Sequence, residues 1–377
     1  MTEGEGLKIG VTCYPFLGGS GVVATELGIE LAHTGHEVHF ITSIQPLRLK
    51  HFQRNIFFHQ VDIEHYPVFQ SPPYVLNLAV KMAEVIRTRG LDILHVHYAI
   101  PHSVSAYLAR EIVGADKIRV VTTLHGTDIT LVGNKPGFYD ITRFAIQGSD
   151  AVTTVSEFLR KKTIETFHIT KEIIVIPNFV HQRRFTPLTV TVRRDMFAAP
   201  HEKILMHASN FRPVKRVDSV MRIFSGVASV IPARLILMGD GPELPGARRM
   251  AEELHIADRV TFLGGSESVD EVFPVADLFL LPSDHEGFGL AALEAMSCAV
   301  PVIGTARGGM KEFINHGTNG FLFDPDDIDG MVEKARQILS DEALRLSIGR
   351  RARCTVTQHY TWEKVVKKYV EVYRSLL

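Results

Sequence analysis

Short apolar segments alternate with amphipathic helical patterns along most of the 377-residue chain. Alternation of this kind is typical of βαβ units, in which parallel strands are joined by crossover helices. The pattern pauses over residues 177–200, which contain three prolines and several charges, and begins again at Ile204. The sequence therefore predicts an α/β fold made of two doubly wound, Rossmann-like domains joined by a linker.

The expected elements follow from the apolar runs and from the Gly and Pro residues that mark their ends. Strands are expected at residues 7–14, 37–42, 93–97, 119–124, 151–155 and 173–176, and then at 204–208, 234–238, 259–263, 278–281 and 300–304. The clearest helical patterns cover residues 21–33, 74–89, 101–113, 326–339, 341–359 and 361–377.

Composition limits the classes of function. Hydrophobic residues make up 45% of the chain, enough for two cores, and the formal net charge of −1 gives no global attraction to nucleic acid or to an anionic membrane. The three cysteines, Cys13, Cys298 and Cys354, form no paired or zinc-binding spacing, which indicates a reduced, cytoplasmic setting. We see no signal peptide and no apolar run of the roughly 20 residues that a membrane span needs.

Two glutamates, Glu286 and Glu294, are separated by seven residues. Glu286 precedes a Gly-Phe-Gly turn, and the helix that follows should place the two carboxylates near its opposite ends, with free N–H donors between them. Carboxylates and amides in this order suit the hydroxyls and oxygens of a nucleotide sugar. A bare pair would be read as surface glutamates, but the strand at 278–282 and the apolar segment 299–303 favour a ligand site.

Two cations, Arg212 and Lys215, follow a strand and open a helical pattern. Cations beside a helix N-terminus are suited to a diphosphate, whereas the plain alternative is a solvated helix start. The turn that begins at Gly239 also follows a strand, and its glycines allow the backbone to approach a ligand closely.

Two other kinds of site were weighed. Gly19-x-Gly21-x-x-Ala24 matches a dinucleotide-binding fingerprint, but the second strand ends at Ser43 without the acidic residue that would hold a ribose. An NAD enzyme is therefore disfavoured. Asp324-Pro325-Asp326 matches the Asp-x-Asp pattern of metal-dependent transferases. The proline and the helical pattern after it nevertheless favour a helix cap.

Two histidines, His95 and His97, alternate on one expected strand. They could serve as metal ligands, but no third ligand stands at a workable spacing, so packing at the strand end is the favoured interpretation.

Taken together, these motifs resemble the retaining glycosyltransferases of the two-domain GT-B fold. The resemblance covers nearly the whole chain and rests on Gly18-Gly19-Ser20-Gly21, His125-Gly126-Thr127-Asp128, Arg212 with Lys215, Gly239-Asp240-Gly241-Pro242-Glu243, Glu286 to Glu294, Gly308-Gly309 and Gly320-Phe321-Leu322. It implies an acceptor-binding domain of residues 1–178 plus 360–377 and a nucleotide-sugar-binding domain of residues 179–359. It also implies a central cleft, and a last helix that crosses back to the first domain.

The resemblance further implies the residues that handle the donor. Glu286 would position the hexose, Lys215 and Arg212 would stabilise the leaving UDP without a metal or any other cofactor, and His125 would contact the sugar. A front-face reaction is implied, in which the leaving phosphate oxygen takes the acceptor's proton. Further donor contacts are implied for Gly19, Ser209, Gly239, Leu263, Phe288, Gly289, Leu290 and Glu294.

Three stretches, residues 11–15, 122–130 and 209–216, carry a closer likeness to family members that transfer GlcNAc from UDP-GlcNAc to L-malate in bacillithiol biosynthesis. This likeness implies that the malate contacts are Ser20, Tyr98, Thr127, Arg143 and Asn178. Other acceptors, such as an inositol phosphate, a sugar or a lipid, stay open, as does a nucleotide-binding module without transferase activity. The oligomeric state, a homo-oligomer included, also stays open.

Two further positions carry expectations. Asp128 either faces the donor or is structural, as a loop brace or a helix cap. Ala299 stands where family members often have Gly, and we expect little effect there, because the position is a turn before a strand.

Overall fold

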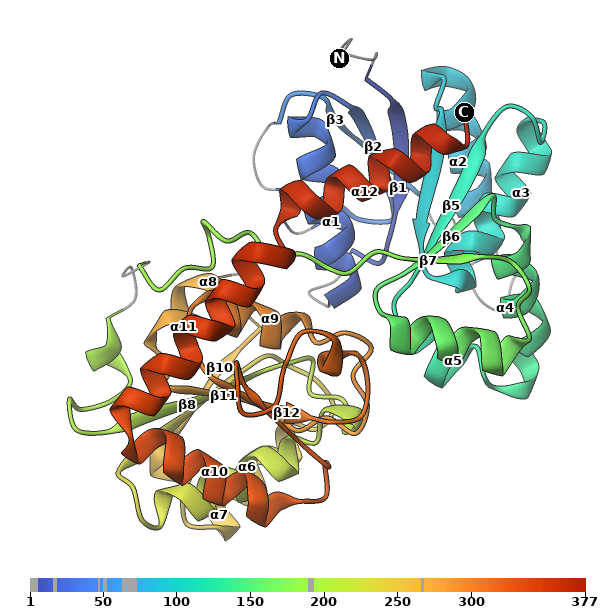
Figure 1. The fold of residues 1–377 in the computed structure, drawn as a ribbon. Helices are drawn as coiled ribbons and strands as arrows, with labels where there is room; N and C mark the ends of the chain where they lie inside the picture. Colours follow the sequence, from blue (N-terminus) through green and yellow to red (C-terminus); the bar gives the residue numbers. More distant parts are fainter. Residues whose placement is uncertain are drawn as a thin grey trace. The chain divides into compact units, whose positions relative to one another are not determined.

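The chain is divided into two units in the computed structural model, which describes residues 6–15, 19–46, 48–49, 53–62, 73–188, 193–265 and 268–377. Unit 1 comprises Met1–Asn178 together with Trp362–Leu377, and unit 2 comprises Phe179–Thr361 (Figure 1). The C-terminal helix therefore belongs to unit 1, although the whole of unit 2 precedes it in the sequence.

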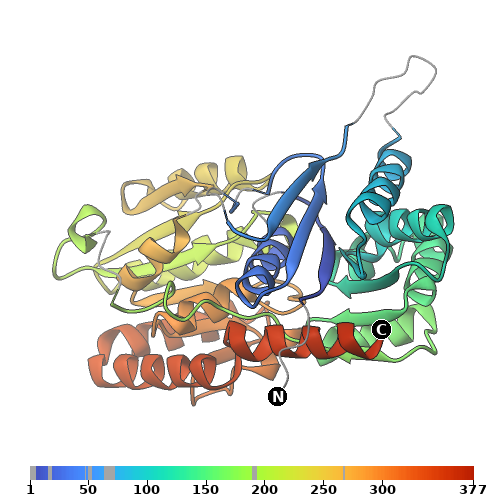
Figure 2. The ribbon, with the colours of Figure 1, turned by 90° about the horizontal axis from the view of Figure 1, so that it is seen from above.

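Unit 1 is built on a seven-stranded sheet in the order β3-β2-β1-β4-β5-β6-β7, and every neighbouring pair is parallel. The strands are β1 (Lys8–Thr12), β2 (Glu37–Thr42), β3 (Ile56–Gln60), β4 (Ile93–His97), β5 (Arg119–Leu124), β6 (Ala151–Thr154) and β7 (Ile173–Val175). Helices cover both faces of the sheet (Figures 1 and 2): α1 (Gly19–His33), α2 (Tyr74–Arg89), α3 (Val104–Val113), α4 (Pro136–Gly148), α5 (Glu157–Phe167) and α12 (Trp362–Ser375).

Helix α12 completes the core of unit 1. It packs against α1, and its buried face includes Val366, Tyr369 and Tyr373. The Tyr373 hydroxyl lies 2.7 Å from Nδ1 of His95 on β4. The GT-B expectation that the last helix joins the first domain is confirmed.

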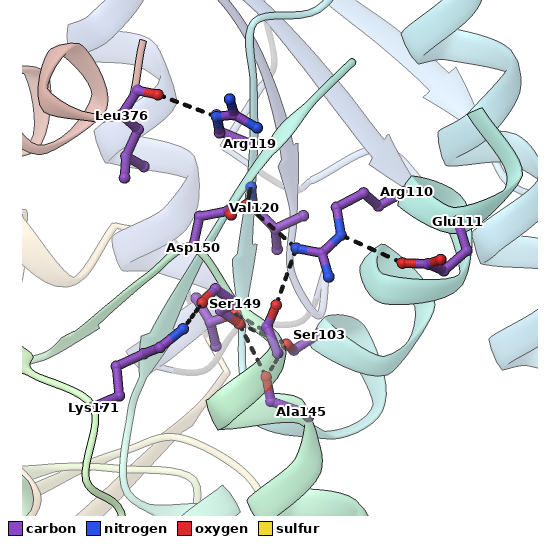
Figure 3. A network of polar contacts seen from close by, with 12 residues as sticks. Ser103, Arg110, Glu111, Arg119, Val120, Ala145, Ser149, Asp150, Lys171 and Leu376 are labelled. Carbon is purple, nitrogen blue, oxygen red and sulfur yellow. Dashed lines mark hydrogen bonds and ion pairs between the residues drawn. The ribbon is translucent and has the colours of Figure 1, made fainter. Parts of the chain in front are cut away.

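A polar network ties the N-terminal ends of β5 and β6 to their surroundings (Figure 3). Arg119 Nε donates to the carbonyl of Leu376 at 3.1 Å, which anchors the end of the chain to the sheet. Asp150 accepts from the Val120 N–H at 2.7 Å and from Arg110 Nη1 at 3.4 Å. These bonds satisfy polar groups that would otherwise be costly to bury.

Unit 2 has a six-stranded parallel sheet in the order β10-β9-β8-β11-β12-β13. Its strands are β8 (Lys203–Ala208), β9 (Ala233–Met238), β10 (Val260–Gly264), β11 (Leu278–Leu281), β12 (Val302–Thr305) and β13 (Phe321–Phe323). Its helices are α6 (Val217–Ala228), α7 (Leu244–Glu253), α8 (Val269–Val272), α9 (Leu290–Ser297), α10 (Ile328–Ser340) and α11 (Glu342–His359). The two parallel sheets with their covering helices confirm the expected α/β, doubly wound class.

The sequence interpretation missed two edge strands, β3 and β13, and misplaced several element starts by two or three residues. Strand β3 has only partly covered side chains, so it lacks the fully apolar run that identifies the central strands. The helix expected from residue 101 begins at Val104, because a π-helical turn, η1 (Ala99–Ser103), precedes it. The strand expected from residue 300 begins at Val302.

Each sheet has one point at which the strand order reverses, called its switch point. In unit 1 this point lies between β1 and β4, and in unit 2 it lies between β8 and β11. The loops that leave the carboxyl ends of two such strands diverge, so ligands of open α/β sheets bind there. Most of the sequence-derived site residues follow these four strands.

Candidate active site

The switch point of unit 2 is bridged by an ion pair between two of the expected site residues. Lys215 Nζ lies 2.7 Å from Glu286 Oε2, and the two side chains are only 20% and 12% exposed. Lys215 ends a short 3-10 turn, η4 (Pro213–Lys215), in the loop after β8, and Glu286 stands in the loop after β11. The Ser283 hydroxyl donates to the same Oε2 at 3.2 Å. The structure thus brings together two of the residues expected to be catalytic.

Glu286 is held by its backbone as well as by its side chain. Its N–H donates to the Arg307 carbonyl at 3.2 Å, and its own carbonyl accepts from the Gly309 N–H at 2.8 Å. A Cβ at Gly308, whose φ is +127°, would stand 2.1 Å from the Glu286 carbonyl oxygen. The Gly308-Gly309 pair is therefore required by a close approach to the Glu286 backbone.

Helix α9 begins immediately after the Gly-Phe-Gly turn. Gly289 is its N-cap, with a left-handed φ of +100°, and Leu290 is its first residue. Phe288 is buried against the rings of Phe313 and Tyr360. Glu294, 8% exposed, lies in the middle of α9. The expectation of carboxylates near opposite ends of this helix is wrong, because α9 extends to Ser297.

The loop after β8 is fixed by a buried histidine. His207 donates from Nδ1 to the Leu280 carbonyl at 2.8 Å, because a carbonyl only accepts, so its Nε2 is the acceptor for the Ser209 hydroxyl at 2.8 Å. Ser209 Oγ in turn accepts from the Phe211 N–H at 3.2 Å. The pKa of His207 is lowered to about 4, mainly by burial and in smaller part by the charge of Lys215, against the opposing effect of the bond to Leu280, so the ring is neutral.

The glycine turn after β9 closes on the same loop. A Cβ at Gly239 would lie 1.7 Å from the Ser209 carbonyl oxygen, and one at Gly241 would lie 2.1 Å from that of Asn210. The Gly239 N–H donates to the Gly264 carbonyl at 2.7 Å, at the end of β10. Leu263, on β10, is partly exposed. The two βα turns of this half of the sheet therefore pack backbone against backbone.

Arg212 and Lys215 lie shortly before a helix, as expected, but they do not belong to its first turn. Arg216, with a left-handed φ of +49°, separates η4 from α6, which begins at Val217. The Arg212 side chain is exposed and makes no ion pair with any residue that the structure describes. Its charge is available to an anion.

Both aspartates of the Asp324-Pro325-Asp326 motif form ion pairs with arginines. Asp324 is paired with Arg307 at 2.8 Å, and Asp326 is paired with Arg216 at 2.6 Å. The expected helix cap is one residue further on, because Asp327 accepts from the Gly330 N–H at the start of α10. Within the described ranges, no group of three or more His, Cys, Asp and Glu side chains is arranged to hold a metal ion.

The switch point of unit 1 is bridged by a hydroxyl pair. Ser20 Oγ donates to the Tyr98 hydroxyl at 2.7 Å, which joins the start of α1, after β1, to the end of β4. Tyr98 has a positive φ of +84°, and its ring centroid lies 5.4 Å from that of His125. Gly19 is the exposed first residue of α1, and Gly18 lies outside the described residues.

Asp128 braces the loop that carries His125. Its Oδ1 accepts from the backbone N–H groups of Gly126 at 2.9 Å and His125 at 3.3 Å, while Oδ2 accepts from that of Ala99 at 3.1 Å. Burial raises the pKa of this carboxyl to about 6, against the opposing effect of these bonds. The geometry therefore favours the structural alternative for Asp128. Thr127 lies in the same braced loop and is partly exposed.

The other two expected acceptor residues stand on separate elements of unit 1. Arg143 is exposed on α4, a helix that packs against η1, and Asn178 is buried at the end of the unit. Of the expected donor set, Gly19 and His125 belong to unit 1, and the remaining residues belong to unit 2.

Three polar residues at strand ends were not recognised as site residues from the sequence. They are His97, which contacts His125, together with His207 and Ser283. Each interrupts or closes an apolar strand with a side chain that is fully buried in the fold. A polar residue at the carboxyl end of a central strand is the signal that would have found them.

Comparisons with known proteins agree with this geometry. The model for Glycosyl transferases group 1 matches residues 191–355, and that for Glycosyltransferase Family 4 matches residues 17–184. The chain is 48% identical over 372 residues to the N-acetyl-alpha-D-glucosaminyl L-malate synthase of Bacillus anthracis, covering 98% of this chain and 97% of that protein. It is also 32% identical to the D-inositol 3-phosphate glycosyltransferase of Mycolicibacterium smegmatis, over 50% of this chain and 44% of that protein.

A solved structure shares the fold. The Anabaena protein HepE, in complex with UDP and glucose, superposes with a TM-score of 0.82 at 20% identity, covering 98% of this chain and all of HepE. In the part of the chain that the structure describes, no helix is long and apolar enough to cross a membrane. From the two family models and the full-length relative, the chain belongs to the GT-B glycosyltransferase family.

Proposed function

We propose that the protein is a retaining glycosyltransferase that moves GlcNAc from UDP-GlcNAc to the hydroxyl of L-malate, releasing UDP. The observation that carries the proposal is the 48% identity to an N-acetyl-alpha-D-glucosaminyl L-malate synthase along nearly the full length of both chains. The ordered polar groups at both switch points support it, because a transferase needs separate places for a donor and an acceptor.

In this proposal unit 2 binds the donor. Arg212 and Lys215 face the diphosphate, Glu286 accepts hydrogen bonds from hexose hydroxyls, and Glu294 accepts them from the ribose. The other donor contacts of unit 2 are Ser209, Gly239, Leu263, Phe288, Gly289 and Leu290. His207 already takes the Ser209 hydroxyl hydrogen, so Ser209 meets the donor through its backbone or as an acceptor.

Unit 1 binds the acceptor and contributes Gly19 and His125 toward the donor. Arg143 pairs with a malate carboxylate, for which the planar guanidinium is well shaped. Ser20, Tyr98, Thr127 and Asn178 supply hydroxyl and amide groups. The 2.7 Å bond between Ser20 and Tyr98 holds two of these groups at a fixed spacing.

The chemistry proceeds on one face of the sugar. The bond between C1 and the β-phosphate oxygen breaks, the malate oxygen bonds to C1 from the same side, and the malate hydroxyl proton passes to the departing phosphate oxygen. Negative charge grows on UDP as this happens, and Lys215 and Arg212 stabilise it there. No metal or other cofactor takes part in the proposed step, and the free thiols fit a cytoplasmic enzyme.

The test is a UDP-release assay on the purified chain over a panel of donors and acceptors, with and without EDTA. We expect turnover with UDP-GlcNAc and L-malate that survives EDTA, and an α-linked product by NMR. Turnover with inositol phosphate, a sugar or a lipid in place of malate would replace the acceptor assignment. Activity lost in EDTA and restored by magnesium or manganese would overturn the metal-free step.

A further inference from the structure

Two histidines of unit 1 share a single hydrogen bond. His97 Nδ1 lies 2.8 Å from His125 Nε2, and the two ring centroids are 5.1 Å apart. His97 is the last residue of β4 and His125 directly follows β5, so the pairing of these adjacent strands sets the distance. One hydrogen occupies such a bond, and one ring donates while the other accepts.

Both rings are neutral at physiological pH. Burial lowers the pKa of His125 to about 3 and that of His97 well below its usual value, and the neighbouring rings of His95 and His102 lower the latter further. The nearest acid of the loop, Asp128, is engaged by backbone N–H groups. Each imidazole therefore carries one hydrogen, on one of its two nitrogens.

The other ring nitrogen of His97, Nε2, decides which of the two histidines donates the hydrogen bond. This nitrogen is buried and has no hydrogen-bond partner among the described residues. If His125 donated, His97 would have to carry its own hydrogen on Nε2, as a buried N–H without an acceptor, which folded proteins rarely contain. If His97 donates from Nδ1, only a bare ring nitrogen is buried.

We propose that His97 is a positioning residue that fixes the tautomer of His125. By donating to Nε2, it forces the His125 hydrogen onto Nδ1, so that His125 offers a neutral N–H donor to an oxygen of the donor sugar. Nδ1 of His125 has no hydrogen-bond partner among the described residues and the residue is partly exposed, so this donor is available. The functional half of this proposal depends on the function proposed above, whereas the tautomer does not.

The tautomer is measured directly by NMR on the full-length chain with ¹⁵N-labelled histidine, the His125 signals being assigned by their loss in His125→Ala. We expect the hydrogen of His125 on Nδ1. We compare His97→Leu with His97→Asn, which have similar shapes, because only the Asn amide can still donate near the Nδ1 position. The Leu variant should release His125 to the other tautomer, and the Asn variant should keep it. A wild-type hydrogen on Nε2, or an unchanged tautomer in His97→Leu, would overturn the proposal.

The matched control is His95→Gln, which alters a buried histidine of the same strand. His95 bonds to Tyr373 and Thr123 and not to His125, so this variant should lower the melting temperature while leaving the His125 tautomer unchanged. A tautomer shift there would indicate general loosening and sink the proposal.

Kinetics give a separate readout. With UDP-GlcNAc and L-malate, kcat should fall about five- to tenfold in His97→Leu, as expected for one lost neutral hydrogen bond, and recover in His97→Asn. The malate KM should not change. Should the wild type ignore malate while the tautomers behave as described, the acceptor assignment fails and the role of His97 stands. A normal kcat in His97→Leu would remove the functional half of the inference.

Discussion

Lys215 Nζ and Glu286 Oε2 stand 2.7 Å apart although the two residues are 71 positions apart in the sequence. Their loops leave β8 and β11, the neighbouring strands at which the order of the unit 2 sheet reverses. In the function proposed above, the pair brings a cation for the diphosphate and a carboxylate for the hexose to one place. Each group also limits the cost of burying the other's charge, since an unpaired charge at a partly buried position is unfavourable.

Lys215→Ala should lower kcat about 10²- to 10³-fold, while the affinity for UDP falls much less. The charge on the departing diphosphate is greatest in the transition state, where Lys215 would act. Steady-state kinetics and calorimetry with UDP separate the two effects. Lys311→Ala, at a lysine on the 3-10 turn η7 (Gly309–Glu312) with no place in the proposed site, is the control. A normal kcat with only a raised donor KM would contradict the assignment.

Arg143→Ala should raise the L-malate KM about ten- to a hundredfold and leave UDP affinity nearly intact. This range corresponds to the loss of a hydrogen bond to a charged group, about 1.5–3 kcal/mol. Gln147→Ala removes an exposed side chain one turn further along α4 and should behave like the parent. If Arg143→Ala uses malate as the parent does, the acceptor carboxylate is bound elsewhere.

Asp128→Asn should change how stability depends on pH. The folded pKa of about 6 is above the reference value of 3.8, so the folded state binds more protons between these values and loses stability as pH rises through them. The full effect is about 3 kcal/mol, at roughly 1.4 kcal/mol per pH unit. Relative to the parent, Asp128→Asn should therefore be more stable at pH 7.5 than at pH 4, as measured by urea unfolding. A constant difference between the two proteins would show that Asp128 does not titrate in this range.

Ala299→Gly should stabilise unit 2, contrary to our expectation that the alanine has little effect. Ala299 has a left-handed φ of +60°, which costs a residue with a Cβ about 1–2 kcal/mol. Part of that gain is lost to the greater freedom of glycine in the unfolded chain, so a net gain of about 0.5–1 kcal/mol is expected. Ala306→Gly, in a loop position outside the left-handed region, should give no gain. Melting temperatures of the two variants decide the matter.

Much of this fold could be predicted from the sequence because its central strands are buried on both faces. Strand β11 is a continuous apolar run, β4 and β5 are rich in Ile, Leu, Val and Thr, and the predicted bounds of all three match the structure. The edge strand β3 was not recognised because its side chains are only partly covered, and β13 was not recognised because it is only three residues long.

The candidate site, like the fold, has features that the sequence predicts and features that it does not. Lys215 and Glu286 could be identified because glycine turns and charged residues stand at fixed places after strands. Their mutual ion pair could not be predicted, since strand order, not sequence order, makes β8 and β11 neighbours. The C-terminal end of α9 could not be placed either: the helix continues past Glu294 to Ser297, so Glu294 lies in its middle and not at its end. The 3-10 turn at Lys215 depends on the left-handed conformation of Arg216, which the sequence does not predict because arginine has no preference for that conformation.

The membership of α12 in unit 1 has a consequence for the order in which the protein matures on the ribosome. Residues 179–361 are continuous, so all of unit 2 has been made before α12 is translated. The N-terminal half emerges earlier, but its core lacks Tyr369 and Tyr373 until α12 has been translated. The part of the chain that is made first is therefore completed last, and premature termination before Trp362 should leave the buried face around His95 uncovered in every copy.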